Sequence, residues 1–557
     1  MARADRWAPT LWSLVLAVLM LGGALGPGYV LSYDMVWVPD LVLTRDAWGV
    51  GTALPRAVPS DAVVAVLDTV IPGMLLQKLV LLGSLVGAGT GAAALIGRRS
   101  LGAQLVAASL IMWNPFVVER LVIGHWPVLV GYAVLPWLLL VVRRWDVGAR
   151  WPAALPVLLV LGSLSASTGV ATGIAALAGG WRRRAGRRNA LLAASVLAAN
   201  LPWLVAGLLH AADATSAAAG AEVFAASGEG LLPGPLAALS LGGIWNVEVV
   251  PATRLGFLAV ASLVAVGALA VAGGLTHRRT PIAGLAALVV CWAAGWGLAV
   301  VSWAAPDAIG WLAAHVPGGG LLRDGSRLLA LAAPLTVVLA ARGADAALER
   351  LPDPPTRVLV AGLLALLPVA LMPDAAWGSS GELRAVSYPS VLHDMRAAVH
   401  EAPAGDVVLL PFTSYRAPEW NNGHKVLDPL PRFVGRQAIA NDVLSVDGRP
   451  IPGEDPRAAD VADALALGTP EERGRALAAL GVAVVVSEQL GTQEIVEVTG
   501  ETTFDEDGLR VVEVEGEVRA EEVPRQWTAA MGVAWVAWLG LFVGGSASGV
   551  RRKVTRE

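Results

Sequence analysis

Apolar segments of about 20 residues recur along the whole chain, and this repetition limits the fold more than any other feature of the sequence. Each segment is long enough to cross about 30 Å of hydrocarbon as a helix. Of the 557 residues, 55% are hydrophobic and 15% are charged, against roughly 25% charged residues in soluble domains. The sequence therefore predicts an α-helical membrane protein that crosses the bilayer many times.

Clusters of arginine and lysine predict how the chain is oriented in the membrane. Short cytoplasmic loops keep positive charge, whereas external loops carry less of it. An even number of expected spans separates each consecutive pair of clusters, so we expect all clusters and both termini to face the cytoplasm of a cell whose plasma membrane the protein crosses. The clusters contain Arg3 and Arg6; Arg98 and Arg99; Arg143, Arg144 and Arg150; Arg182, Arg183, Arg184, Arg187 and Arg188; Arg278 and Arg279; Arg342, Arg350 and Arg357; and Arg551, Arg552 and Lys553.

The apolar segments predict about 12 spans, two of which form a short hairpin. Residues 152–180 have arginines on both sides but are too short for two full crossings at about 1.5 Å per residue. The sequence "SLSAST" interrupts them, so we expect two short helices that are buried among their neighbours. The other expected spans are 11–31, 74–96, 101–118, 127–142, 190–210, 255–273, 282–303, 327–341, 358–372 and 527–543.

Three domains follow from this topology: a multi-span membrane domain with external loops (1–372), an external soluble domain (373–526), and a final span with a basic cytoplasmic tail (527–557). Within the external domain, apolar runs predict strands at 405–412, 482–489 and 509–514. Helices are expected at 389–402 and after Thr469, which forms a capping box with Glu472. This mixture predicts an α/β or α+β domain that the last span tethers to the membrane.

An acidic external segment directly follows the first expected span. It reads "LSYDMVWVPD" (31–40) and contains Asp34 and Asp40 among aromatic residues. One interpretation is a polar loop whose Tyr33 and Trp37 belong to an interfacial aromatic belt. The other is that Asp34, one turn beyond the helix and partly desolvated, is a general base whose pKa is raised by burial. Asp40 is the second candidate for this role.

The segment "NPFVVERLVIGHWP" (114–127) places ionisable residues at the outer ends of two expected spans. Glu119 and Arg120 lie at the end of one span, and His125 lies at the start of the next. Ionisable residues at membrane depth are costly, so they usually pair or serve a site. Two interpretations follow: an interfacial pair of Glu119 with Arg120, or three supporting residues of an active site.

The segment "PGGGLLRDGSRLLALAAP" (317–334) places Arg323 and Arg327 on the expected external side, against the usual distribution of positive charge. A glycine-rich backbone with guanidinium groups at a helix start is a good receptor for phosphate. At the membrane surface, the phosphate of a lipid is the natural ligand. Lys78, near the outer end of the second span, is a third candidate cation. The alternative is a glycine-rich turn with side chains that reach toward the interface.

The external domain contains a weaker signal, "RAPEWNNGHK" (416–425), in which Trp420 and Asn421 suit binding of a glycan acceptor. The same residues are equally typical of a plain turn. The net charge of −4 gives no reason to expect a nucleic-acid partner. The single cysteine, Cys291, excludes an intramolecular disulfide.

These features together resemble the GT-C class of integral-membrane glycosyltransferases. The segments "WNPFVVERLVIGHWPVLVGYAVLPWLLL" (113–140) and "GGGLLRDGSRLLALAAP" (318–334) are similar to actinobacterial arabinofuranosyltransferase-like and YfhO-like membrane proteins. The resemblance implies that Asp34 takes the base position and that Arg323 and Arg327 bind the phosphate of a polyprenyl-phosphate sugar. The first external loop has no DxD or paired aspartates, so the use of a divalent metal (Mg²⁺ or Mn²⁺) stays open.

The resemblance implies transfer of a sugar, such as arabinofuranose or mannose, from a polyprenyl-phosphate donor to a cell-envelope glycan or lipid acceptor on the external face. A transporter or flippase for a lipid-linked sugar is one alternative, and it predicts charged residues deep inside the spans and internal repeats. A membrane scaffold that binds envelope glycan without catalysis is the other. That alternative predicts that the acidic residues of the first external loop are dispensable.

Overall fold

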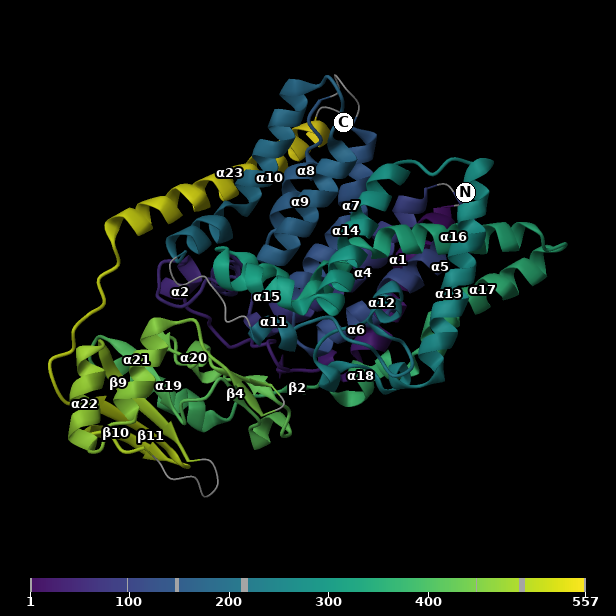
Figure 1. The fold of residues 1–557 in the computed structure, drawn as a ribbon. Helices are drawn as coiled ribbons and strands as arrows, with labels where there is room; N and C mark the ends of the chain where they lie inside the picture. The colour runs from purple at the N-terminus through teal and green to yellow at the C-terminus, as the bar shows by residue number, and fades with distance from the viewer. Residues whose placement is uncertain are drawn as a thin grey trace.

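The computed structural model describes residues 3–97, 99–145, 150–211, 219–446, 448–489 and 496–554. Figure 1 shows a large helical bundle and, at the lower left, a smaller domain that contains a β-sheet. The bundle helices are α1 (Arg3–Leu21), α4 (Gly73–Ile96), α5 (Leu101–Met112), α6 (Pro115–Val122), α7 (Trp126–Arg144), α8 (Ala154–Gly162), α9 (Ala166–Gly180), α10 (Gly186–Leu209), α13 (Phe257–Leu275), α14 (Leu285–Ala304), α16 (Ala333–Glu349), α17 (Pro354–Leu371) and α23 (Arg525–Val554).

Within the described residues, nine helical segments are long and apolar enough to cross a membrane. A tenth is bent by 45° between the 3-10 helix η6 (Gly325–Leu331) and α16. The expected hairpin is confirmed, because α8 and α9 are short helices separated by Ser163–Ser165 and packed against α7 and α10. The chain is therefore a membrane protein of the expected kind, built from long spans plus one short helical hairpin.

Glycine allows two of the spans to cross at very short distance. A Cβ atom on Gly273 of α13 would lie 1.9 Å from the carbonyl oxygen of Leu339 in α16. A Cβ atom on Gly343 of α16 would lie 1.9 Å from the carbonyl oxygen of Leu269. Small residues let membrane helices approach closely and gain van der Waals contact in the absence of a hydrophobic driving force. These two glycines therefore fix the crossing of α13 and α16.

Shorter helical segments connect the long helices of the bundle. They are η1 (Gly22–Leu25), α2 (Arg45–Trp48), α3 (Ser60–Asp68), α11 (Ala219–Val223), α12 (Gly234–Leu239), η2 (Val247–Val249), η3 (Ala252–Leu255), η4 (Thr276–Arg278), α15 (Pro306–His315), η5 (Gly319–Leu322), η7 (Pro373–Ala375) and α18 (Ala376–Gly381).

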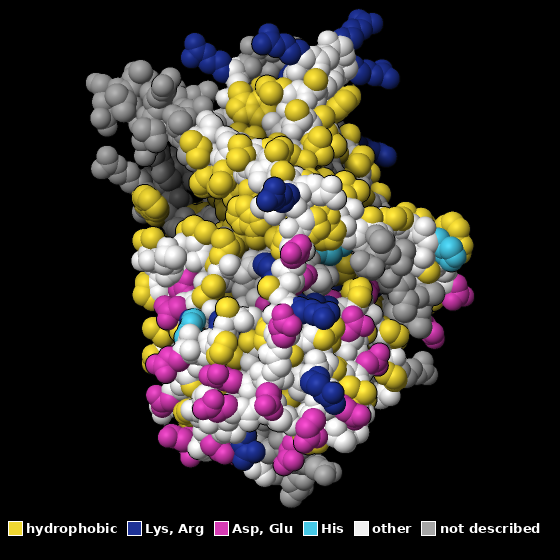
Figure 2. All heavy atoms as spheres, turned by 90° about the vertical axis from the view of Figure 1, so that its left-hand side faces the viewer, with side chains coloured by type: hydrophobic (Ala, Val, Ile, Leu, Met, Phe, Trp, Pro, Cys, Tyr) yellow, Lys and Arg dark blue, Asp and Glu magenta, His cyan; other side chains and the backbone are white. Residues whose placement is uncertain are grey.

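The surface has the layers that a bilayer requires. Figure 2 shows a band of hydrophobic side chains across the upper half of the molecule and acidic side chains over the lower half, where the sheet-containing domain lies. Arginine and lysine side chains gather at the upper edge of the band. This distribution agrees with the expectation that basic clusters and the acidic external domain lie at opposite ends of the spans.

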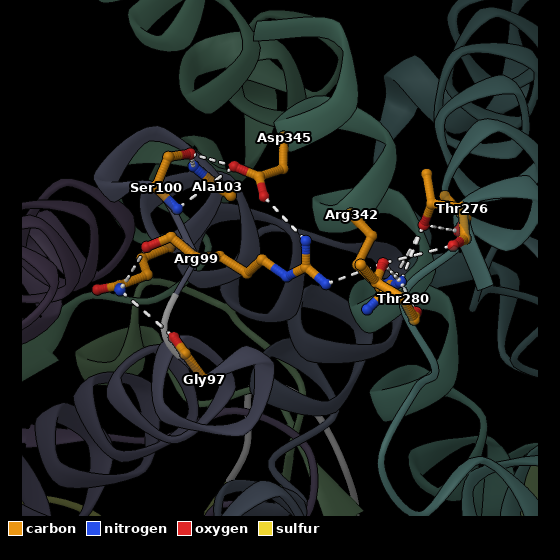
Figure 3. A network of polar contacts seen from close by, with 10 residues as sticks. Gly97, Arg99, Ser100, Ala103, Thr276, Thr280, Arg342 and Asp345 are labelled. Carbon is orange, nitrogen blue, oxygen red and sulfur yellow. Dashed lines mark hydrogen bonds and ion pairs between the residues drawn. The ribbon is translucent and has the colours of Figure 1, made fainter. Parts of the chain in front are cut away.

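A polar network ties two loops to helix α16 at the end of the bundle away from the sheet-containing domain (Figure 3). Arg99 pairs with Asp345 of α16 at 3.4 Å, and the Ser100 hydroxyl also donates to that carboxylate. Arg342 donates to Thr276 Oγ1 at 2.9 Å and to Thr280 Oγ1 at 2.7 Å. Three of the predicted cytoplasmic basic regions thus meet in one place, as an even number of crossings between them requires.

The first span ends earlier than the sequence predicts. Helix α1 stops at Leu21, and after η1 the chain is extended at β1 (Tyr29–Val30), so the expected helix over 11–31 is wrong in its last third. Glycines cause the difference: Gly22 and Gly28 adopt positive φ angles of 48° and 104°, which a helix does not allow. Asp34 consequently lies in a folded loop rather than one turn beyond a helix.

The sheet-containing domain has a mixed five-stranded sheet with the order β10-β11-β9-β3-β6. Strand β3 runs parallel to β6 and β9, whereas β11 is antiparallel to β9 and β10. The strands of the domain are β2 (Ala385–Val386), β3 (Asp406–Leu410), β4 (Tyr415–Arg416), β5 (Val426–Leu427), β6 (Ala438–Ile439), β7 (Leu444–Val446), β8 (Arg449–Ile451), β9 (Val482–Glu488), β10 (Gly500–Glu506) and β11 (Leu509–Val514). Its helices are α19 (Ser390–Glu401), η8 (Glu419–Asn421), α20 (Leu430–Phe433), α21 (Pro456–Leu465) and α22 (Pro470–Ala479).

The predictions for this domain are confirmed element by element. The three expected strands are β3, β9 and β11, and the two expected helices are α19 and α22. Thr469 caps α22, and the capping box with Glu472 is complete. Residues 515–524 then lead from β11 to α23, the tether seen at the left of Figure 1.

The first external loop forms part of the core of the sheet-containing domain. Strand β1 pairs with β2, and Leu31, Val36 and Val38 are buried together with residues of α19 and β9. Ion pairs reinforce the contact, since Arg45 binds Asp406 at 2.5 Å. The loop and the domain therefore hold each other in place over the outer end of the bundle.

Candidate active site

Asp34 lies at the junction of the helical bundle and the sheet-containing domain. Its backbone N–H donates to the carbonyl of Ile123 at 3.0 Å, while the N–H of the preceding Tyr33 donates to the carbonyl of Lys425 at 2.9 Å. The turn after α6 fits the loop closely: a Cβ atom on Gly124 would lie 2.1 Å from the nitrogen of Met35. Glycine is required there, and contacts from both sides fix the position of the Asp34 backbone.

His125 forms a hydrogen bond with the carboxylate of Asp34. Its Nε2 lies 3.0 Å from Asp34 Oδ2, and its Nδ1 lies 3.0 Å from Nη1 of Arg120. A guanidinium group can only donate, so Nδ1 accepts and the ring proton resides on Nε2, from which it is donated to Asp34. Burial and the charge of Arg327 lower the pKa of His125 to about 4, so the ring is neutral at physiological pH.

A buried ion-pair cluster supports this histidine. Asp324 accepts from Arg120 Nη1 at 3.2 Å and from Arg327 Nε at 3.0 Å. The Ser326 hydroxyl donates to Asp324 at 2.6 Å and accepts from Arg120. Burial raises the pKa of Asp324, but Arg120 and Arg327 outweigh it and hold that pKa well below its usual range. Asp324 is therefore an anion that orients two guanidinium groups.

The external domain contributes Tyr415 of β4, whose hydroxyl donates to Asp34 Oδ1 at 2.5 Å. Burial raises the pKa of Asp34, as the sequence suggests, but the hydrogen bonds from His125 and Tyr415 and the charge of Arg327 outweigh burial. The expectation of a raised pKa is thus wrong, and the pKa of Asp34 is lowered. The carboxylate stays ionised and accepts hydrogen bonds from two positioned donors.

The side chains of the site differ in solvent exposure: some can contact a substrate, and others are buried and position the exposed ones. The side chains of Asp34 and Arg327 are 38% and 37% exposed, whereas Arg120 and His125 are buried. Arg323 lies beside them: its charge interacts with that of Arg327, and its Nη1 binds Glu454 at 3.1 Å. One carboxylate and two arginines therefore face the same accessible region at the bundle–domain junction.

Sequence reasoning found several members of this network but missed others. The structure brings together Asp34, Arg120, His125 and Arg327, which come from four separate parts of the chain. Tyr415 was missed because nothing in the sequence connects it to a partner 381 positions away. Asp324 and Ser326 were visible next to the candidate arginines, but their role depends on the burial of Arg120 beside them.

The remaining candidates lie outside the network. Asp40 is 86% exposed and faces Arg396 of the external domain, and the Lys78 amine contacts Gln77 at 3.4 Å. Glu119 contacts Glu229, which binds Arg254 at 2.6 Å.

Trp420 and Asn421, the candidate glycan-binding pair, have packing roles. Trp420 packs against Tyr388 with ring centroids 5.1 Å apart and the ring planes tilted by 46°, and the buried Asn421 amide donates to the carbonyl of Leu31 at 3.3 Å. These contacts join the first external loop to the domain.

Whether the site can hold a metal ion depends on the described side chains around Asp34. Within the described part of the chain, no group of three His, Cys, Asp or Glu side chains has the geometry to hold a metal ion. Asp34 is surrounded by hydrogen-bond donors rather than by further carboxylates. We therefore assign no step of a reaction to Mg²⁺ or Mn²⁺.

Solved structures with a similar fold can now be compared. Arabinofuranosyltransferase AftD from Mycobacteria matches 94% of this chain with a TM-score of 0.55 and 17% sequence identity. A variant of AftD, in one of its conformational classes, matches 93% with a TM-score of 0.54. The chain therefore shares the fold of part of AftD. It spans 40% of the length of that larger protein. Neither a family model nor a curated protein matches the sequence.

The neutral state of His125 predicts a pH dependence of stability. In the unfolded chain the histidine takes up a proton below about pH 6.5, whereas in the folded protein its pKa is about 4. The unfolded state thus binds more protons between these values, and folding stability falls as the pH is lowered through this window. The contribution of His125 reaches about 3 kcal/mol at most.

The variant His125→Gln keeps a donor toward Asp34. We expect its thermal unfolding midpoint to change less between pH 4 and 6.5 than that of the wild type. The measurement is the difference between the two thermal unfolding midpoints in detergent at each pH. An identical slope for both proteins would show that His125 is already charged in the folded state.

Proposed function

We propose that the protein is a membrane glycosyltransferase that moves a sugar from a polyprenyl-phosphate donor to an acceptor hydroxyl at the outer membrane surface. The observation that carries the proposal is that Asp34 and Arg327, both partly exposed, are joined through the buried network of His125, Arg120 and Asp324. A carboxylate and a guanidinium group held by the same network suit the two ends of a displacement reaction.

In this reaction the acceptor oxygen attacks the anomeric carbon, and the bond from that carbon to the phosphate oxygen breaks. Arg327 and Arg323 bind the departing phosphate and stabilise its charge. Asp34 orients the acceptor hydroxyl and accepts its proton. A carboxylate with a low pKa can do so because the hydroxyl becomes acidic as its oxygen bonds to carbon. His125, Arg120 and Asp324 keep both groups in position.

The lipid part of the donor has a suitable place within the bundle. An apolar cavity of about 480 Å³ lies between α13, α14, α16 and α17, and it reaches Asn114 and Pro115 at the start of α6. Arg120 on the same helix belongs to the site. An isoprenoid chain is apolar enough to occupy such a cavity.

The sugar to test first is taken from the similar structure, and the acceptor from the accessible side of Asp34. AftD is an arabinofuranosyltransferase, which makes arabinofuranose the first sugar to test. Mannose, the other sugar that the sequence resemblance implies, is the second. The acceptor approaches from the external side, where Tyr415 of the external domain reaches Asp34. A cell-envelope glycan or lipid carrying free hydroxyls fits this direction of approach.

The test is a transfer assay with purified protein, radiolabelled polyprenyl-phosphate arabinofuranose or mannose, and envelope glycan fragments. We expect transfer from the lipid-linked donor, and a KM for that donor that Arg327→Gln raises about 10- to 100-fold, the size of a charge-assisted hydrogen bond. Arg510→Gln is the matched control, because Arg510 is also a partly exposed arginine paired with an aspartate but lies in the external domain. If Arg327→Gln leaves the KM for the donor unchanged, Arg327 does not bind the donor phosphate.

A further inference from the structure

The carboxylate of Glu454 lies between two arginines that come from distant parts of the chain. Its Oε1 pairs with Nη1 of Arg323 at 3.1 Å, and its Oε2 pairs with Nη2 of Arg56. The Glu454 side chain is only 7% exposed. Each oxygen of one carboxylate thus binds a different guanidinium group, an arrangement that a phosphate with its several acceptor oxygens can also satisfy.

This pair of arginines belongs to the same region as the candidate active site. The charge of Arg56 interacts with that of Asp34, and the charge of Arg323 interacts with those of Arg56 and Arg327. Three guanidinium groups, two of them at least one-third exposed, therefore lie around the accessible carboxylate. Arg56 comes from the first external loop and has no counterpart among the sequence-based candidates.

Each of two carboxylates in this region is shared by two arginines. Asp324 pairs with Arg120 and Arg327, and Glu454 pairs with Arg56 and Arg323. Asp442 lies 3.9 Å from Arg56 and accepts the backbone N–H groups of Glu454 and Asp455. A phosphate bound by Arg323 would consequently meet the carboxylate of Glu454. Two anions on the same guanidinium group repel each other, so the phosphate and the Glu454 carboxylate cannot both stay bound there.

We propose that the carboxylate of Glu454 competes with the donor phosphate for Arg56 and Arg323. Once Glu454 has moved away, Arg56 and Arg323 together bind the phosphate. The identity of the ligand as a donor phosphate rests on the proposed function. The competition between Glu454 and an anion does not, because it follows from the two ion pairs alone.

The position of Glu454 connects donor binding to the external domain. Glu454 lies between β8 and α21, and its backbone is held by Asp442 of the same domain. When an anion displaces the carboxylate, this part of the external domain loses its contacts to Arg56 and Arg323. Binding of the lipid phosphate and the position of the domain that faces the acceptor are thereby coupled, with the same coupling free energy in both directions.

The test compares the wild type with Glu454→Gln, using inorganic phosphate and farnesyl phosphate as probes in titration calorimetry of the detergent-solubilised full chain. Glu454→Gln keeps the shape of the side chain and removes its charge. We expect both probes to bind about fivefold more tightly to this variant, the size of a partly exposed ion pair. Glu488→Gln is the matched control, since Glu488 also pairs with an arginine of the external domain, Arg416, and is expected to leave both affinities unchanged.

Two further measurements separate competition from a general loosening of the protein. Adding Arg56→Gln to Glu454→Gln is expected to abolish the gain in affinity, because the guanidinium group that Glu454 uncovers is then missing. In the wild type, saturating farnesyl phosphate is expected to speed amide hydrogen exchange at Glu454 and Asp455. The exchange at these two positions reports the displacement directly.

Equal affinity of the wild type and Glu454→Gln for both probes, including no binding by either, would overturn the competition. A gain in affinity that survives the loss of Arg56 would overturn the role of Arg56. Failure of the proposed function gives a different result: no sugar transfer from any lipid-linked donor, with phosphate still binding more tightly to Glu454→Gln.

Discussion

Asp34→Asn lowers the rate of sugar transfer by about 100-fold or more, the usual contribution of a positioned general base. The amide cannot take the proton of the acceptor hydroxyl. The variant should still fold, because its side-chain oxygen can accept from His125 Nε2 and the loop is held by backbone contacts to Ile123 and Lys425. The measurement is the initial rate with labelled polyprenyl-phosphate sugar at saturating donor, together with the thermal unfolding midpoint.

Asp40→Asn is the matched control for this prediction. It makes the same substitution in the same external loop, but Asp40 is exposed and faces Arg396 instead of the His125 network. We expect its transfer rate to stay within about twofold of the wild type, since surface substitutions have small effects. Near-normal transfer by Asp34→Asn would reject the assignment of Asp34, and equal losses in both variants would point to a defect of the whole loop.

Asp324→Asn destabilises the protein by about 3–5 kcal/mol, the cost of removing one partner from a buried ion pair. Arg120 is completely buried, and its guanidinium group binds Asp324 and Ser326. Without the carboxylate, a buried positive charge remains beside a neutral histidine. The expected result is a large fall in the thermal unfolding midpoint and a loss of transfer, because Arg327 also loses the partner that orients it.

The double variant Arg120→Met with Asp324→Leu tests whether the loss comes from the unpaired charge. Replacing both members of a buried pair by apolar residues is often close to neutral for stability. We expect it to recover much of the unfolding midpoint but none of the activity. Asp505→Asn, which breaks the exposed pair with Arg510, should change the midpoint very little. An unchanged unfolding midpoint for Asp324→Asn would show that the burial of Arg120 does not require the charge of Asp324.

Elements with a strong local pattern could be predicted from the sequence. The strands around Val407, Val484 and Val511 are continuous apolar runs, and the helix after Thr469 carries its own capping box. The hairpin at 152–180 could be expected because its length and its flanking arginines exclude two full crossings. In each case the information lies within a few residues, where burial and hydrogen bonding act locally.

The first external loop shows where local patterns fail. Hydrophobic residues continue to Leu31 and suggest a longer span, but Ala24 and Val30 pack in the core of the bundle and Leu31 in the core of the sheet-containing domain. The sequence shows that these residues are hydrophobic, but it does not show which part of the protein buries them. The lowered pKa of Asp34 has the same origin, because its donors His125 and Tyr415 come from other parts of the chain.

The sequence by itself determined that this protein is a multi-span membrane protein with a C-terminal mixed domain, and it pointed to ionisable residues in unusual positions near the ends of the spans. These properties depend on composition and on spacing within single segments. Only the tertiary structure decided which of those residues meet: Asp34 with His125 and Tyr415, Arg120 with Asp324, and Glu454 with Arg56 and Arg323. Electrostatic and hydrogen-bonding energies depend on distances of a few ångströms, and those distances are set by packing between segments that are far apart in the chain.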